Sequence, residues 1–352
     1  MKFMKIYTLA VILILAVAFS SIAPANIARG QQPNPPASGQ QKTQKDKKPA
    51  EDEAPQDDQI ITLGTELVTV PFNVTDKKNH YITDLGKDDV EVLEDNKPQQ
   101  VFSFERQTDL PITIAMVIDV SISEEATLPY EKEAGKRFFS RVLRPKKDLG
   151  AVITFEGDAT LVQGLTSDPE RIQRALDEVR ITAAGAVARS GVGTPPINGD
   201  SRAGSTAIWD AVYSVSTDLL SREAGRRVII LITDGQDTSS RVKMREAIER
   251  TWRKEVIIYS IGIGDPGYGG VDSGSLKKIA SETGGRAFFP RNETDLDEAF
   301  KQIDEDLRTQ YLLAYTSTNG SKDGSFRTIQ LRVKSRKDMV VRHRRGYFAK
   351  AS

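Results

Sequence analysis

The sequence contains no cysteine, and only two of its 352 residues are histidine. Without cysteine there can be no disulfide, no thiolate metal site, no thiol nucleophile and no lipid anchor on an N-terminal cysteine. His80 and His343 lie far in sequence from the acidic and hydroxyl residues considered below. This argues against a histidine-based catalytic triad and against a zinc site.

The sequence also lacks an excess of charge of either sign, because 49 lysine and arginine residues balance 49 aspartate and glutamate residues. No global field therefore favours nucleic acid or an anionic membrane. The basic stretch from Arg327 to Lys350 is interpreted as a guard against aggregation of edge strands, although its arginines beside aromatic residues could also contact phosphates. We expect no nucleic-acid partner.

The N-terminal region has the pattern of a secretory signal. Lys2 and Lys5 precede an apolar run from Ile6 to Phe19, and small residues follow at Ala23-Pro24-Ala25. We predict a signal peptide over residues 1–25. The alternative is an uncleaved anchor, which would be the chain's one link to a membrane, although the run is short for a bilayer span. Either interpretation places the rest of the chain outside the cytoplasm: periplasmic, at the cell surface or secreted.

Segments that differ in composition and in hydrophobic periodicity follow the predicted signal peptide. Residues 26–58 carry almost no large apolar side chain, so we expect a disordered linker there. Residues 59–107 and 309–352 contain short alternating runs separated by turn residues, which indicate antiparallel strands. Because these two segments bracket the central region, we expect one small β-sandwich with the central region inserted in it; two separate β appendages are the alternative.

The central region, residues 108–308, alternates unbroken apolar strands with helical periodicity. This alternation predicts the α/β class: a doubly wound, mostly parallel six-stranded sheet with helices on both faces. The run from Ala159 to Leu165 follows its predecessor after one short turn, which suits an antiparallel edge strand.

Oxygen-bearing side chains follow two of these strands and precede one helix. Asp119-Val120-Ser121-Ile122-Ser123 ends the first strand, Thr206 opens a later helix, and Asp234-Gly235 ends the strand from Val228 to Ile232. In an open parallel sheet, ligands gather beyond the C-terminal ends of the strands. Each piece alone would be interpreted as a turn or a helix cap, but their joint order in an α/β pattern points to a shared site.

Together these residues resemble the metal ion-dependent adhesion site of von Willebrand factor type A domains. The resemblance covers roughly Pro111 to Leu307, and the whole layout with β flanks is similar to the exported bacterial proteins called acidobacterial VWFA-related. It implies that the three hydroxyls bind a metal directly and that the two carboxylates act directly or through water. Carried over position by position, the predicted metal ligands are Asp119, Ser121, Ser123, Thr206 and Asp234.

Hard oxygen donors favour Mg²⁺, with Mn²⁺ or Ca²⁺ also acceptable. Three neutral hydroxyls and only two acids, partly separated by water, would leave positive charge on the metal, so a partner's Asp or Glu could complete its shell. We therefore predict an exported, non-enzymatic protein-binding module with no catalytic residue and no small-molecule substrate. The alternatives are a Mg²⁺-dependent hydrolase or phosphoryl-transfer enzyme using Asp119, and a purely structural metal.

Two further stretches were considered as possible binding segments. The Gly-, Ala- and Pro-containing stretch from Ala183 to Arg202 could be a binding loop or an insertion without a role. The Gly262-to-Gly267 stretch formally matches a dinucleotide fingerprint, but Pro266 stands where a helix should open, so we interpret it as a chance match.

Overall fold

The computed structural model describes residues 67–106, 109–181, 205–264, 267, 269–334, 336 and 338–351. The predicted signal peptide, the predicted linker and the stretch 183–202 lie outside these residues. Within the described ranges, no helix is long and apolar enough to span a membrane.

The central region forms a six-stranded sheet with the strand order β10-β9-β8-β5-β6-β7. Neighbouring strands are parallel except at the edge, where β7 runs antiparallel to β6, as predicted for this segment. The strands are β5 (Ile112–Asp119), β6 (Leu149–Phe155), β7 (Ala159–Thr166), β8 (Arg226–Thr233), β9 (Val256–Gly262) and β10 (Ala287–Phe288).

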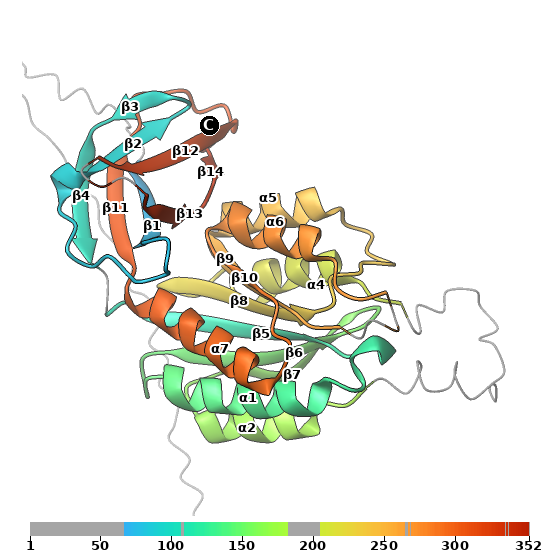
Figure 1. Ribbon diagram of the computed structural model, residues 1–352. Coiled ribbons are helices and arrows are strands. Elements are labelled where there is room, and N and C mark those ends of the chain that lie inside the picture. Colours follow the sequence, from blue (N-terminus) through green and yellow to red (C-terminus); the bar gives the residue numbers. More distant parts are fainter. Residues whose placement is uncertain are drawn as a thin grey trace, which may run out of the picture. The chain divides into compact units, whose positions relative to one another are not determined.

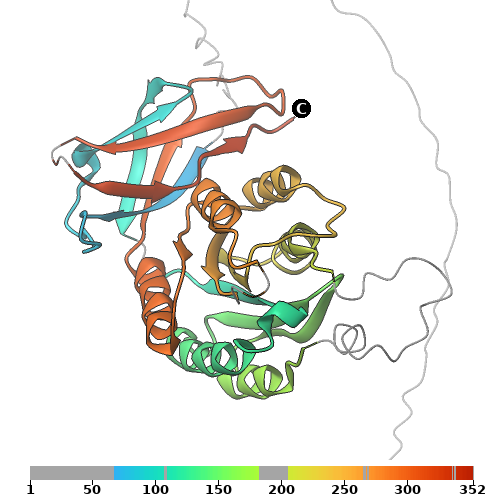
Figure 2. The same ribbon diagram turned by 45° about the vertical axis from the view of Figure 1, so that its right-hand side comes forward.

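Helices cover both faces of this sheet, as can be followed in Figures 1 and 2. All eight residues of β5 are buried, because its side chains alternate between the two helix layers. Ile114 and Met116 pack with Phe138 of α1, whereas Ala115 and Val117 pack toward the helices of the other face. One layer consists of α1 (Leu128–Val142), α2 (Pro169–Glu178) and α7 (Glu293–Arg308), and the other of α4 (Ile208–Ser214), α5 (Met244–Lys254) and α6 (Ser273–Thr283).

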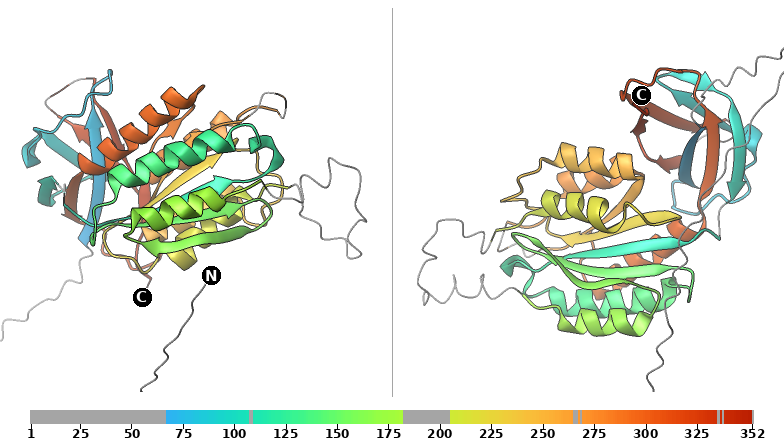
Figure 3. Two further views of the ribbon diagram at one scale, coloured as in Figure 1. Left: turned by 90° about the horizontal axis from the view of Figure 1, so that it is seen from below. Right: turned by 180° about the vertical axis from the view of Figure 1, so that it is seen from behind.

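The two flanking segments form two four-stranded antiparallel sheets, in the orders β13-β1-β11-β4 and β14-β12-β2-β3. Strands from both flanks pair directly: Leu67 lies opposite Thr316, and Glu94 lies opposite Ile329. Figure 3 shows early strands in blue and cyan beside late strands in orange and red. The strands are β1 (Leu67–Thr75), β2 (Val90–Glu94), β3 (Lys97–Gln99), β4 (Val101–Arg106), β11 (Tyr311–Thr316), β12 (Phe326–Val333), β13 (Val340–His343) and β14 (Gly346–Phe348).

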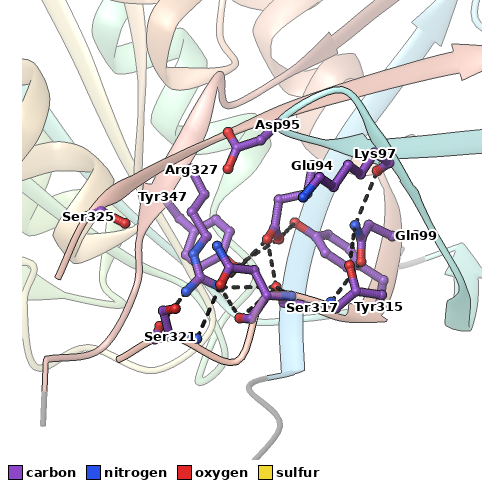
Figure 4. Close-up of polar contacts among 12 residues, drawn as sticks. Glu94, Asp95, Lys97, Gln99, Tyr315, Ser317, Ser321, Ser325, Arg327 and Tyr347 are labelled. Atoms are coloured by element: carbon purple, nitrogen blue, oxygen red, sulfur yellow. Dashed lines mark hydrogen bonds and ion pairs between the residues drawn. The ribbon is translucent and has the colours of Figure 1, made fainter. Parts of the chain in front are cut away.

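A buried ion pair lies among these strands, drawn in Figure 4. Glu94 and Arg327 are 2% and 1% exposed, and Arg327 Nη1 lies 3.6 Å from Glu94 Oε1. Glu94 also accepts hydrogen bonds from the hydroxyls of Ser317 (2.6 Å), Tyr315 (2.8 Å) and Tyr347 (2.9 Å). This buried carboxylate is therefore compensated entirely by groups of the chain itself.

The predicted fold class is confirmed: a mostly parallel six-stranded α/β sheet accompanied by antiparallel sheets. The domain boundaries at residues 107 and 308 stay a prediction. The helix expected to open at Thr206 is interrupted, because α4 ends at Ser214 and a π-helical turn covers Val215–Leu219. The strands β3, β10 and β14 were not predicted, since runs of two or three residues carry no periodic signal.

Candidate metal centre

The last residue of β5, Asp119, is fully buried at the C-terminal edge of the central sheet. Its Oδ1 accepts a hydrogen bond from the backbone N–H of Ser121 at 3.0 Å, and its Oδ2 accepts one from the hydroxyl of Thr233 at 2.6 Å. Thr233 ends the neighbouring strand β8. Two adjacent strands therefore hold one carboxylate in a fixed orientation.

The two predicted serine ligands lie next to this carboxylate. Ser121 precedes the short 3₁₀ helix Ile122–Glu124, and its Oγ lies 3.0 Å from the Oγ of Ser123. The Ser123 hydroxyl also lies near enough to the carboxylate of Asp234 to oppose the rise in its pKa that burial causes. The backbone of this loop turns through the 3₁₀ helix, and this turn keeps the hydroxyls of Ser121 and Ser123 side by side.

Asp234 follows β8, and its Oδ1 accepts a hydrogen bond from the backbone N–H of Gln236 at 2.9 Å. The intervening Gly235 has φ +84°, and a Cβ there would approach Leu276 Cγ to 2.9 Å and the Asp272 carbonyl oxygen to 3.0 Å. Only glycine meets both requirements without strain. The Asp234-Gly235 pair is therefore a turn that directs the carboxylate of Asp234 toward the end of β5.

Thr206 is held at the same edge through its backbone. Its N–H donates to the hydroxyl of Thr238 at 2.8 Å, and its carbonyl accepts from the Thr238 N–H at 2.9 Å. The next residue, Ala207, donates to the carbonyl of Glu156, directly after β6, at 2.7 Å. Since β8, β5 and β6 are neighbours in the sheet, these bonds place Thr206 with the loops that carry the other four residues.

One carboxylate in this cluster was missed from the sequence. Glu124 is fully buried, and one oxygen each of Asp119, Glu124 and Asp234 lies within 4.8 Å of the others. Glu124 Oε2 accepts a hydrogen bond from the hydroxyl of Thr127 at 2.8 Å, and Oε1 has no partner among the described residues. The available signal was its position directly after Ser123.

A further buried acid, Glu131, lies in the first turn of α1 and is likewise fully buried. Burial raises the pKa of Asp119 to about 6. Burial and the charge of Glu131 raise the pKa of Glu124 to about 9, and burial raises that of Glu131 to about 8. Burial also raises the pKa of Asp234. Within the described ranges, no lysine or arginine forms an ion pair with any of these four acids.

The donor set fits a hard divalent cation. Buried carboxylates cost free energy unless they are paired or coordinate a metal. Here one oxygen of Glu124 lies within 4.8 Å of oxygens of Asp119 and Asp234, and Oε1 of Glu124 has no hydrogen-bond partner in the described part of the chain. Carboxylate and hydroxyl oxygens suit Mg²⁺, Mn²⁺ or Ca²⁺. The metal-binding role of each side chain stays a prediction.

Comparison with known proteins identifies the region that carries this site. Two models of the von Willebrand factor type A domain match residues 114–236 and 197–302. An uncharacterized protein from Borreliella burgdorferi is 28% identical over 158 residues, which are 43% of this chain and 40% of that protein. The chain therefore spans about two fifths of this relative.

Solved structures with a similar fold include proximal thread matrix protein 1 from the mussel byssus, with a TM-score of 0.47 and 23% identity over 61% of this chain and 51% of that one. A second structure of that protein, described as having a zinc-occupied MIDAS motif, gives a TM-score of 0.46 at 24% identity, covering 60% and 48%. A von Willebrand factor type A protein from Catenulispora acidiphila gives 0.46 at 15% identity, covering 72% and 74%.

Proposed function

From the von Willebrand factor type A domain that this chain contains, we infer a metal-dependent protein-binding module that acts outside the cytoplasm. We propose that a divalent cation, Mg²⁺ in the first instance, is held at the C-terminal edge of the central sheet. The proposed ligands are Asp119, Ser121, Ser123, Thr206 and Asp234, with Glu124 as an additional carboxylate.

The observation that carries this proposal is the convergence of three buried acids on one point, with no basic partner among the residues that the structure describes. A bound cation would supply positive charge and a coordination position for a carboxylate oxygen of a protein partner. The chain's own groups orient the two aspartates: the backbone N–H of Ser121 and the hydroxyl of Thr233 hold Asp119, and the backbone N–H of Gln236 holds Asp234.

The protonation state of Glu124 affects which partner side chain the proposed site can accept. If Glu124 were ionised together with Asp119 and Asp234, three negative charges would exceed the two positive charges of the cation. A partner's Asp or Glu would then be repelled. In the metal-free chain, burial and the charge of Glu131 raise the pKa of Glu124 to about 9, so its neutral form predominates at pH 7 before a cation binds. An acidic partner residue is compatible with this site only if Glu124 keeps that proton when the cation is bound.

The enzyme alternative is disfavoured by the surroundings of Asp119. A nucleophilic or basic carboxylate needs a free oxygen facing its substrate. Asp119 is fully buried, so its oxygens are not exposed to a substrate in solution. We propose that Asp119 organises the site and does not react. A screen with phosphate esters that shows turnover in the wild type and none in Asp119→Asn would reverse this assignment.

A pull-down from native envelope or secreted material tests the binding function, run once with Mg²⁺ and once with EDTA. We expect a partner that the wild-type chain retains only with the metal and that Asp119→Asn and Thr206→Ala do not retain. Asp297→Asn is the matched control, because Asp297 lies on α7 and pairs with Arg137. Unchanged retention by the folded Asp119→Asn variant in EDTA would refute the proposal. A large loss of thermal stability on chelation with no metal-dependent partner would favour the structural alternative.

Export is proposed from the N-terminal pattern alone. We expect the mature protein in a native host to begin shortly after Ala25. N-terminal sequencing of the protein recovered from the envelope or the medium checks this, and recovery of the full-length chain from the cytoplasm would contradict it.

A further inference from the structure

The helix α4 begins directly after the proposed metal ligand Thr206, and its first turn has no cap of its own. The first backbone N–H groups of a helix have no partner within the helix, and a serine, threonine, aspartate or asparagine at the helix start usually accepts one of them. Here the capping position is Ala207, whose side chain cannot accept a hydrogen bond. Ile208 and Trp209 are buried, so their N–H groups need acceptors within the protein.

The loop that follows β8 supplies these acceptors. The backbone N–H of Ile208 donates to Asp237 Oδ1 at 2.9 Å. The N–H groups of Trp209 and Asp210 donate to the hydroxyl oxygen of Ser240 at 2.9 and 3.3 Å. Ser240 in turn donates its hydroxyl hydrogen to Asp237, so the two capping side chains orient each other. Two side chains from another loop therefore cap α4 in place of a residue at its own start.

The first turn of α4 also holds this loop in return. The carboxylate of Asp210 accepts the backbone N–H of Arg241 at 3.0 Å and that of Val242 at 2.8 Å. The backbone bonds between Thr206 and Thr238, described above, lie between the same two segments. Thr206 and the start of α4 are therefore fixed against the loop that begins at the other proposed ligand of this edge, Asp234.

We propose that Asp237 and Ser240 are positioning residues for the metal ligand Thr206, an inference that rests on the proposed metal site. A threonine that opens a helix ordinarily uses its side-chain oxygen to accept a backbone N–H. Because Asp237 and Ser240 accept the N–H groups of α4, the Thr206 hydroxyl is not required as a cap, and its oxygen is left for the cation. Without these two acceptors, the helix and the cation would compete for the Thr206 oxygen.

Calorimetric titration of the full chain with Mg²⁺ tests this assignment. Asp237→Ala and Ser240→Ala should each weaken Mg²⁺ binding about tenfold, the usual loss when a group that orients a metal ligand is removed. Asp237→Asn should bind Mg²⁺ within about twofold of the wild type, because its amide oxygen can still accept the N–H of Ile208. This conservative variant separates positioning from a direct effect of the Asp237 charge on the cation.

Asp168→Ala is the matched control. Asp168 caps α2 by accepting the N–H of Glu170 at 2.9 Å. It follows the end of β7, where Thr166 lies opposite Gly150 near the start of β6, so it belongs to the opposite edge of the central sheet. Asp168→Ala should lower the stability of the chain as Asp237→Ala does, since each removes a helix cap, but should leave Mg²⁺ affinity unchanged.

If Asp237→Ala does not fold, Ser240→Ala and Asp237→Asn carry the test. The positioning role is overturned if a folded Asp237→Ala or Ser240→Ala variant binds Mg²⁺ like the wild type, if Asp237→Asn loses as much affinity as Asp237→Ala, or if Asp168→Ala loses it equally. In these cases the wild type still binds the cation, and the proposed metal site stands. A wild-type chain that takes up no Mg²⁺, Mn²⁺ or Ca²⁺ would instead refute the metal site, and the positioning role with it.

Discussion

Two buried carboxylates of this protein have opposite surroundings: Glu94 lies in the antiparallel sheets, and Glu124 lies in the 3₁₀ helix that follows β5. Glu94 is met by Arg327 and by three hydroxyls, all from the chain itself (Figure 4). Glu124 accepts one described side-chain hydrogen bond, from Thr127, and its nearest charged groups are other acids. The two carboxylates are equally buried, but their charges are balanced in different ways. Glu94 is balanced by a structural network of the chain, whereas Glu124 requires a proton or a cation from outside the chain.

The largest loss of stability should come from breaking the hydrogen-bonded ion pair between Glu94 and Arg327. Glu94→Gln removes the charge that pairs with Arg327 and leaves a buried guanidinium uncompensated, so we expect the free energy of unfolding to fall by about 3 to 5 kcal/mol. Urea unfolding measures it, and Glu91→Gln on the same strand is the control, expected to change stability by less than about 0.5 kcal/mol. Equal effects of the two substitutions would show that the ion pair is not important for stability.

The uncompensated acids should make the metal-free protein less stable as the pH rises. Because burial raises the pKa of Asp119 from 3.8 to about 6, the folded state binds more protons than the unfolded state between these values. Its contribution is fully present below pH 4 and is lost by about pH 6, with a loss of about 3 kcal/mol. Glu131 and Glu124 extend the decline toward pH 8 to 9. The test compares the pH dependence of stability for the wild type and Asp119→Asn in EDTA, and parallel curves between pH 4 and 6 would contradict it.

A divalent cation should reverse that loss at neutral pH. Mg²⁺ at about 100 times its dissociation constant should raise the free energy of unfolding by about 2.7 kcal/mol, because it binds the folded state alone. Thermal unfolding at pH 7.5 with Mg²⁺ and with EDTA measures this. The increase should disappear in Asp119→Asn and persist in Glu94→Gln, and an increase of equal size in Asp119→Asn would place the metal elsewhere.

The smallest effect should come from neutralising Glu124 itself. Because its pKa is about 9, Glu124→Gln at pH 7 replaces one neutral side chain by another of similar shape. We expect a change in metal-free stability of less than about 1 kcal/mol, far below that of Glu94→Gln. The same variant should weaken Mg²⁺ binding, and Glu125→Gln is the matched control. A loss as large as that of Glu94→Gln would remove the distinction between the two carboxylates.

The sequence allowed most of the central sheet and much of the site to be predicted. Unbroken apolar runs identified β5 and β8 to within one or two residues at each end, because a strand buried on both faces has no polar alternation. The five proposed ligands were identified from their resemblance to the metal ion-dependent adhesion site, and the position of Asp119 and Asp234 after neighbouring parallel strands is consistent with a shared edge. In the structure, Asp119 accepts a hydrogen bond from the backbone of Ser121, the hydroxyls of Ser121 and Ser123 lie 3.0 Å apart, and Thr206 is attached through its backbone.

Burial and long-range pairing were decided by the tertiary structure. Glu124 and Glu131 read as ordinary polar residues of a loop and a helix, and only the packing of α1 against the sheet removes them from water. In the same way, Asp237 is one of many acidic residues until the fold places it against the start of α4. Local sequence sets periodicity, turns and the order of ligands along the chain, because these depend on neighbouring residues. Which charges are left without a partner depends on residues hundreds of positions apart, and only the folded chain brings those together.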